Sequence, residues 1–339
     1  MLSVQIIQPY NCITAKQIGM SNEPAKLSSP FSTGGGGHYF ENNVQAVFVV
    51  LMLTGGAVPC IQILPIKQIK LQGKYAGYDT DDFIVFAESR DGRQKAKLLA
   101  QIKHSVSITE NDQTFAEVIQ AAWNDFQNPK IFDQATDKIA LITGPLTAHD
   151  IDHARIILDW AKHSATAQEF LDKVKLGKFS AEPKREKLAA FRAQLKKANN
   201  GVDLLDDQFW QFLKSFHLLG FDLDVTSGVT MSLLNSHIAQ FKCGDIAGTW
   251  SKVAKEVESF NKNAGTITLE TISTEIKNAF SEHAPVSHMP TEFLDKIKAK
   301  EVIDFSKGET PDAVALASLL GSWNEKSDGD KEIIKRLVE

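Results

Sequence analysis

Apolar positions in the first half of the chain switch between helical and strand-like spacing. Phe40, Val44 and Phe48 follow an i, i+4, i+8 spacing, which predicts the apolar side of a helix. Short β-prone runs separated by polar turns come next and predict strands. The expected elements, in chain order, are a helix at 39–54, strands at 60–71, 83–86 and 98–102, a helix at 112–127 and a strand at 138–143. This alternation indicates an α/β domain over residues 34–148.

The second half of the chain carries almost only helical spacing. Its apolar stripes predict helices at 151–161, 167–174, 184–195, 206–219, 247–260 and 269–280. Residues 149–339 are therefore expected to form a mainly α-helical connector or assembly domain. Residues 1–33 are polar and contain Pro24 and Pro30, so this N-terminal segment is expected to be partly irregular.

One apolar run raises the question of a membrane span, because no residue from Val44 to Ile66 is charged. Gly55, Gly56 and Pro59 interrupt the run near its middle and leave each half too short to cross a bilayer. A buried helix followed by a buried strand is the favoured interpretation.

Composition places the chain among soluble globular proteins. Its 339 residues are enough for two domains, and they are 43% hydrophobic and 23% charged. The net charge is −5, so nucleic-acid binding would have to use a local basic patch. Cys12, Cys60 and Cys243 lie far apart without a CxxC pair, which argues against a zinc ribbon or a disulfide framework and favours a reducing cytoplasm.

Residues 81–103 combine acid, amide and amine groups on a predicted β-hairpin. An Asp-Gly turn separates its two strands. Strand side chains alternate between faces, so Gln101 and Lys103 point the same way. Asp81 or Asp82, at the start of the first strand, comes near this pair if the strands are neighbours.

These groups suit divalent-metal hydrolysis of a phosphodiester. Carboxylate and amide oxygens are hard ligands for Mg²⁺, which polarises phosphate and lowers the pKa of bound water. Lys103 would hold the attacking hydroxide or offset charge on the phosphoryl oxygens. The alternative is an ordinary hairpin with a solvated charged face. Glu41 is either a first-turn carboxylate that favours the helix dipole or a third acid of the metal site.

Glycines and lysines offer candidate phosphate contacts. The run Gly34 to Gly37 precedes the first helix and could cradle a phosphate, but the lysine and hydroxyl residue of a P-loop are absent. A flexible entry loop is the alternative. Lys67 and Lys70 could meet phosphates, or they could form a solvated strand end. Gly36, Gly37, Lys67 and Lys70 are the candidate nucleic-acid-binding residues.

A second metal signal is weak. His149 and His153 are i, i+4 neighbours on a predicted helix and could bind zinc, but no third ligand stands in a suggestive place. A surface pair near a helix start is the favoured interpretation.

Three stretches carry a resemblance to a known family. GGGGHYFENNVQAVFVVLML, TDDFIVF and LLAQIKHS, in the element order above, resemble the PD-(D/E)xK restriction-endonuclease-like fold. More narrowly, they resemble the double-stranded-DNA endonuclease effector domain of bacterial anti-phage defence proteins of the CBASS and AVAST NTPase-sensor type. The resemblance covers about residues 34–147, and a looser similarity extends through DHARIILDWAKHSATAQEFLDKVK.

The resemblance implies a role for each residue that matches the family motif. Asp82 takes the place of the metal-binding acid, with Asp81 as the neighbouring candidate, and Lys103 is the motif lysine. Gln101 stands where the family usually has Glu or Asp, which predicts weaker metal binding. Glu41 matches the acid on the first helix. All five residues are expected to be catalytic, with Asp82, Gln101 and Glu41 holding Mg²⁺ or Mn²⁺.

The function that the resemblance implies is a cytoplasmic Mg²⁺-dependent endonuclease that cuts double-stranded DNA with little sequence specificity. Double-strand cutting implies at least two active sites, so a homo-oligomer is expected. The expected context is the N-terminal part of a longer protein with a sensor or NTPase domain. The alternative is a catalytically inactive nuclease-fold module that serves interaction or oligomerisation.

Overall fold

The computed structural model describes residues 36–281, except residues 90, 226–227 and 242–244. The described elements from Gly37 onwards belong to one compact unit. The expectations for residues 1–33 lie outside the described residues.

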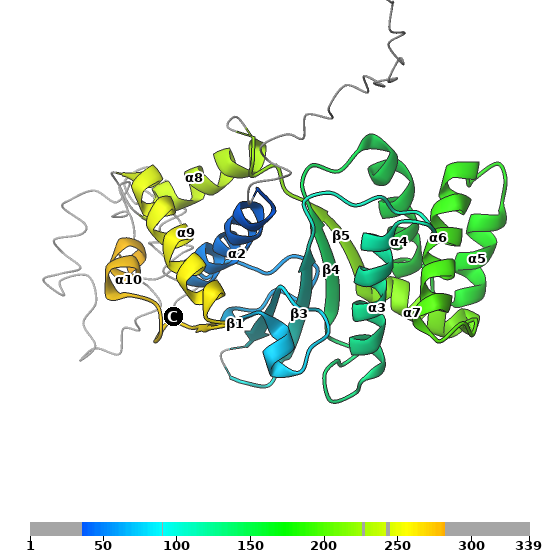
Figure 1. Ribbon diagram of the computed structural model, residues 1–339, viewed down its shortest axis with the longest axis horizontal. Coiled ribbons are helices and arrows are strands. Elements are labelled where there is room, and N and C mark those ends of the chain that lie inside the picture. The colour runs from blue at the N-terminus through cyan, green and yellow to red at the C-terminus, as the bar shows by residue number, and fades with distance from the viewer. Residues whose placement is uncertain (1–35, 90, 226–227, 242–244, 282–339) are drawn as a thin grey trace, which may run out of the picture. The chain divides into compact units, whose positions relative to one another are not determined.

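A mixed six-stranded sheet organises the described elements (Figure 1). The strand order is β5-β4-β3-β2-β1-β6. Strands β3, β4 and β5 run parallel to one another, whereas β3, β2, β1 and β6 pair antiparallel. The strands are β1 (Ile66–Leu71), β2 (Phe83–Glu88), β3 (Lys95–Ile102), β4 (Lys138–Thr143), β5 (Phe216–Gly220) and β6 (Thr266–Ile267).

Helices cover both faces of this sheet, each over its own apolar core (Figure 1). The first core lies under α2 (Gly36–Thr54), α8 (Val229–Phe241), α9 (Ile246–Lys262) and α10 (Thr274–Ser281). The second core lies under α3 (Gln113–Gln127), α4 (Ile156–Lys162), α5 (Ala167–Lys175), α6 (Glu182–Ala198) and α7 (Asp206–Ser215). A 3-10 turn, η1 (Gly73–Ala76), follows β1, and a π-helix, η2 (Asp150–Arg155), leads into α4.

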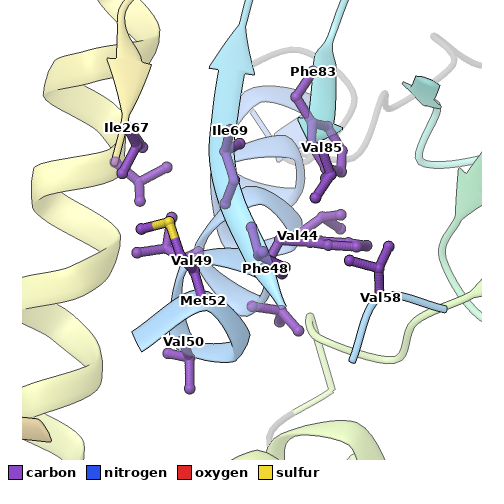
Figure 2. Close-up of a cluster of buried hydrophobic side chains, with 14 of the residues drawn as sticks. Val44, Phe48, Val49, Val50, Met52, Val58, Ile69, Phe83, Val85 and Ile267 are labelled. Carbon is purple, nitrogen blue, oxygen red and sulfur yellow. The ribbon is translucent and has the colours of Figure 1, made fainter. Parts of the chain in front are cut away.

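Helix α2 is buried on almost every side, because sheet and helices enclose it. Figure 2 shows Val44 and Phe48 of α2 gathered with Ile69 of β1, Phe83 of β2 and Ile267 of β6. The rings of Phe48 and Phe83 meet edge to face with centroids 4.9 Å apart. The absence of charged residues from Val44 to the end of α2 therefore reflects burial of this helix inside the protein. No helix among the described residues combines the length and apolarity needed to cross a bilayer.

The expected α/β class is confirmed, and the first half follows the expected order of helix, three strands, helix and strand. No specific restriction-endonuclease fold is confirmed. The proposed division into 1–33, 34–148 and 149–339 stays a prediction, although β5 and β6 join the same sheet from beyond residue 148.

Several boundaries differ from the expectation. Helix α2 includes Gly36 and Gly37 in its first turn, whereas Gly34 and Gly35 lie outside the described residues. Strand β1 begins at Ile66, because the preceding segment carries Pro59 and a left-handed Cys60 with φ of 74°. The helix expected over 206–219 ends at Ser215, and its last residues form β5. They become a strand because Phe216 and Leu218 are buried alternately beside β4.

Candidate functional site

Asp82 lies at the start of β2, directly opposite Gln101 of β3. The antiparallel register pairs Phe83 with Ala100 and so brings the two side chains together. Asp82 Oδ2 accepts hydrogen bonds from Gln101 Nε2 at 2.8 Å and from the backbone N–H of Ile102. No described residue donates to Asp82 Oδ1, and this atom is not among the buried atoms without a partner. One carboxylate oxygen of Asp82 therefore has no hydrogen-bond partner among the described residues.

Glu41, in the second turn of α2, is held by three amides. Its Oε1 accepts from Asn261 Nδ2 at 2.9 Å, Gln45 Nε2 at 3.1 Å and Gln72 Nε2 at 3.3 Å. Its Oε2 lies 3.6 Å from Nδ1 of His38. Glu41 thus uses one oxygen for structure and keeps the other near the surface.

Gln45 connects the Glu41 carboxylate to the backbone of Asp82. Its side chain is fully buried, and its Nε2 lies 3.1 Å from Glu41 Oε1 and 3.4 Å from the backbone oxygen of Asp82. Its Oε1 is buried without a hydrogen-bond partner among the described residues. We refer to Glu41, Gln45, Gln72, Asp82 and Asn261 as the carboxylate cluster.

The charge in this cluster is only partly compensated. Burial, and then the negative charge of Glu41, raise the pKa of the Asp82 carboxyl from 3.8 to about 7. The N–H of Ile102 and the charge of Lys103 act in the opposite direction, and Asp81 adds a further upward contribution. A cation bound beside the Asp82 carboxylate would offset this negative charge.

Asp81 and Gln101 have their polar atoms engaged in structural contacts. Asp81 Oδ1 accepts the backbone N–H of Lys74 in η1 at 3.0 Å, so its carboxylate is tied to that turn. The N–H of Asp81 donates to Gln101 Oε1 at 3.3 Å. Gln101, only 8% exposed, therefore positions the Asp81–Asp82 segment with both ends of its amide. Of the two aspartates, Asp82 is the one that belongs to the carboxylate cluster.

The donor set fits a hard divalent cation. The cluster offers Asp82 Oδ1, the Glu41 Oε2 that lies 3.6 Å from His38 Nδ1, and the Gln45 Oε1 that is buried without a described partner. Nowhere in the described ranges do three or more His, Cys, Asp or Glu residues form a metal-holding group. A cation here would therefore rely on two carboxylates, amide oxygens and water, which is how Mg²⁺ is often bound.

The expected phosphate contacts do not converge on the cluster. Lys70 Nζ donates to the backbone oxygen of Ala264 at 2.6 Å. Lys67 lies four residues before Leu71, about 13 Å along β1 from the end that pairs with Phe83. Gly36 and Gly37 form the first turn of α2, where a Cβ at Gly37 would meet no atom within 4 Å. Their nucleic-acid roles stay predictions.

The two histidines form a ring contact. His149 and His153 stack edge to face with centroids 4.5 Å apart, and His153 Nδ1 is buried without a described partner. No third His, Cys, Asp or Glu joins them within the described part of the chain.

Three residues of the cluster were missed by sequence reasoning. Gln45 carries a usable signal, because it lies four residues after Glu41 on the same helix face. Gln72 follows β1 and adopts a left-handed conformation with φ of 53°. Asn261, at the end of α9, lies 220 residues from Glu41 along the chain, and no local pattern marks it.

Asn261→Ala is expected to lower the free energy of unfolding by about 1–3 kcal/mol, because Glu41 and Asn42 each lose a donor in a buried setting. Urea unfolding monitored by circular dichroism measures the change. Asn124→Ala, at an exposed position of α3, is the matched control and should be nearly neutral. Equal unfolding midpoints for both variants would show that Asn261 does not support the cluster.

Comparisons with known proteins give little further assignment. No protein-family model matches the chain, and no curated protein matches it. A solved structure of the Acinetobacter baumannii Cap4 SAVED/CARF-domain containing receptor, with the cyclic trinucleotide 3'3'3'-cAAA, is similar with 11% identity and a TM-score of 0.37. The similarity covers 68% of this chain and 44% of that chain. At this level it assigns no function here.

These findings contradict the expected membership of the PD-(D/E)xK endonuclease family. The similar structure is described as a cyclic-trinucleotide receptor, and no nuclease family model matches. The double-stranded-DNA endonuclease function that rested on the resemblance is therefore wrong as an assignment. The short stretches that carried the resemblance describe a hairpin and a buried helix, features that do not define one family. The expected homo-oligomer stays a prediction.

Proposed function

We propose that the protein binds a divalent cation of the Mg²⁺ class at Glu41 and Asp82, and that it does so together with an anionic ligand placed beside Lys103. The single observation that carries the proposal is the presence of two carboxylates in one cluster. Asp82 Oδ1 has no hydrogen-bond partner among the described residues, and Glu41 Oε2 lies 3.6 Å from the exposed His38 ring. Metal binding by these residues does not depend on the endonuclease assignment.

Lys103 supports the anionic part of the proposal. It follows β3 directly, its charge acts on Asp82, and its side chain is partly exposed. A cation held by Glu41 and Asp82 and an ammonium beside it would together favour a ligand with negatively charged oxygens, such as a phosphate group. Gln101 would position Asp82 through its hydrogen bond, and its expected role as a direct metal ligand stays a prediction.

Calorimetric titration of the full chain with MgCl₂ and then MnCl₂ at pH 8 tests the cation site. Binding is expected for the unaltered protein and at least tenfold weaker binding for Asp82→Asn and for Glu41→Gln, because each loses a charged oxygen ligand. Asp91→Asn removes a carboxylate from the exposed β2–β3 turn and should leave binding unchanged. Equal binding by all four proteins would contradict the proposal.

The cation affinity is also expected to rise about tenfold between pH 6 and pH 8. The pKa of Asp82 is raised to about 7, so a proton competes with the cation at pH 6 and is largely gone at pH 8. The same titration repeated at both pH values measures this change. A flat profile would show that Asp82 is not a ligand.

A further inference from the structure

A cavity of about 340 Å³ lies against the outer edge of the sheet, separate from the carboxylate cluster. Strand β5, the last strand on that side of the described sheet, forms one wall. The lining residues are Pro59, Arg155, Asp159, Lys162, His217, Leu218, Leu219, Gly220 and Phe221. We call this space the edge cavity.

One helical face supplies the charged wall of the edge cavity. Arg155 ends η2, and Asp159 and Lys162 follow in α4 at spacings of four and three residues, so the three side chains share a face. Lys162 Nζ lies 3.3 Å from Asp159 Oδ1, whereas no ion pair of Arg155 occurs among the described residues. Lys138, at the start of β4, adds a positive charge that acts on His217. The wall therefore carries more positive than negative charge.

The pKa of Lys138 is consistent with this crowding. Burial lowers it, and the positive charges of Lys214 and Lys162 lower it further, while Asp137 raises it. An anion bound near these lysines would offset their positive charges.

The strand wall offers hydrogen-bonding groups. His217 Nε2 is shielded from solvent and has no partner within the described ranges. The N–H of Phe221 donates to Thr143 of β4 at 2.9 Å, so by the alternation of a parallel ladder the N–H groups of Leu218 and Gly220 point away from β4. Both residues line the edge cavity.

The wall of the edge cavity does not provide a nucleophilic cysteine. Cys60 follows Pro59 of the cavity, and burial raises the pKa of its thiol to about 11. Burial, and then the charges of Lys162 and Lys138, lower the pKa of His217 to about 3. Thiol and imidazole are both neutral at pH 7, which is the opposite of an activated thiolate–imidazolium pair.

We propose that the edge cavity binds a small oxyanion-bearing ligand, held by Arg155 and Lys162 and hydrogen-bonded by His217 and the outer edge of β5. The volume is at the lower end of the range for small-ligand sites. Phosphate and carboxylate groups share the chemistry that this wall recognises, because both accept charge-assisted hydrogen bonds from Arg and Lys. The site is independent of the proposed cation site.

Calorimetry of the full chain in EDTA, with inorganic phosphate in one arm and succinate in the other, tests the edge cavity. Binding of at least one probe is expected, and Arg155→Gln combined with Lys162→Met should weaken it at least tenfold. The arm that gives the tighter binding identifies the oxyanion class. The double variant Lys175→Met and Lys178→Met removes two positive charges from exposed positions and should change the affinity less than twofold.

The imidazole resonances of His217, assigned with His217→Phe, should shift on addition of the bound probe in the unaltered protein and in Asp82→Asn. Retention of binding in Asp82→Asn separates this site from the cation site. A dissociation constant of about 100 μM is the affinity expected for the probe that binds. The proposal is overturned if neither probe binds at 10 mM, because the affinity would then be on the order of a hundredfold weaker. It is also overturned if both double variants lose affinity equally, or if Asp82→Asn abolishes binding.

Discussion

Asp82→Asn is expected to raise the free energy of unfolding at pH 8 by about 2–4 kcal/mol in the absence of a divalent cation. Burial and the Glu41 charge raise the pKa of Asp82 to about 7, against 3.8 for an ordinary aspartate. The folded protein therefore holds a proton that the unfolded chain releases between these two values. Because the native state binds more protons there, the stability from this group falls as the pH rises from about 4 to about 7.

Asparagine removes the buried charge while its oxygen can still accept the N–H of Ile102. The stability difference between Asp82→Asn and the unaltered protein should be near zero at pH 4 and fully developed at pH 8. Urea unfolding at a series of pH values measures it. Asp91→Asn is the matched control, and its change in the free energy of unfolding should have the opposite sign. The reason is that the Ser89 hydroxyl first, and then the N–H of Arg93, lower the pKa of Asp91. If Asp82→Asn were destabilising at pH 8, the raised pKa of Asp82 would be refuted.

Lys187→Met is expected to lower the free energy of unfolding by about 3 kcal/mol. Lys187, on α6, is 7% exposed and donates to Asp150 Oδ1 at 3.0 Å and to the backbone oxygen of Ile108 at 3.1 Å. Methionine fills the space but leaves a partly buried carboxylate without its cation. The largest loss therefore comes from the unpaired charge of Asp150.

A second variant separates this charge effect from a packing effect. Asp150→Asn combined with Lys187→Met removes both charges and should recover about 2 kcal/mol of the loss. Urea unfolding of the single and double variants gives the coupling free energy. A double variant no more stable than Lys187→Met would assign the loss to packing alone.

Local sequence patterns predicted the helices and strands whose apolar faces are evident from the spacing of apolar residues. The Phe83–Phe86 run, its Asp-Gly turn and the following strand formed the hairpin that sets Asp82 opposite Gln101. Burial of Phe115 and Phe126 agrees with the apolar side expected for α3. These predictions succeeded because periodicity and turn chemistry act over a few residues.

Contacts across the sheet could not be predicted from local patterns. The stretch from Asp206 to Leu219 has helical spacing throughout, yet its end becomes β5 because β4 offers an unpaired edge. Asn261 reaches Glu41 only after α9 has packed on the first core. Family membership failed for a related reason, since three short stretches matched a pattern while the chain as a whole matched no family model.

The position of Asn261 bears on the order of events during synthesis. Glu41 leaves the ribosome 220 residues before Asn261, and Ile69 of β1 leaves it 198 residues (267 − 69) before its partner Ile267 of β6. Until then the Glu41 carboxylate and the amides of Asn42, Asn43 and Gln45, which are buried in the folded protein, are exposed to water. Strand β1 also lacks its neighbour β6. Closure of such distant contacts is slow, so the carboxylate cluster is expected to be completed late in folding.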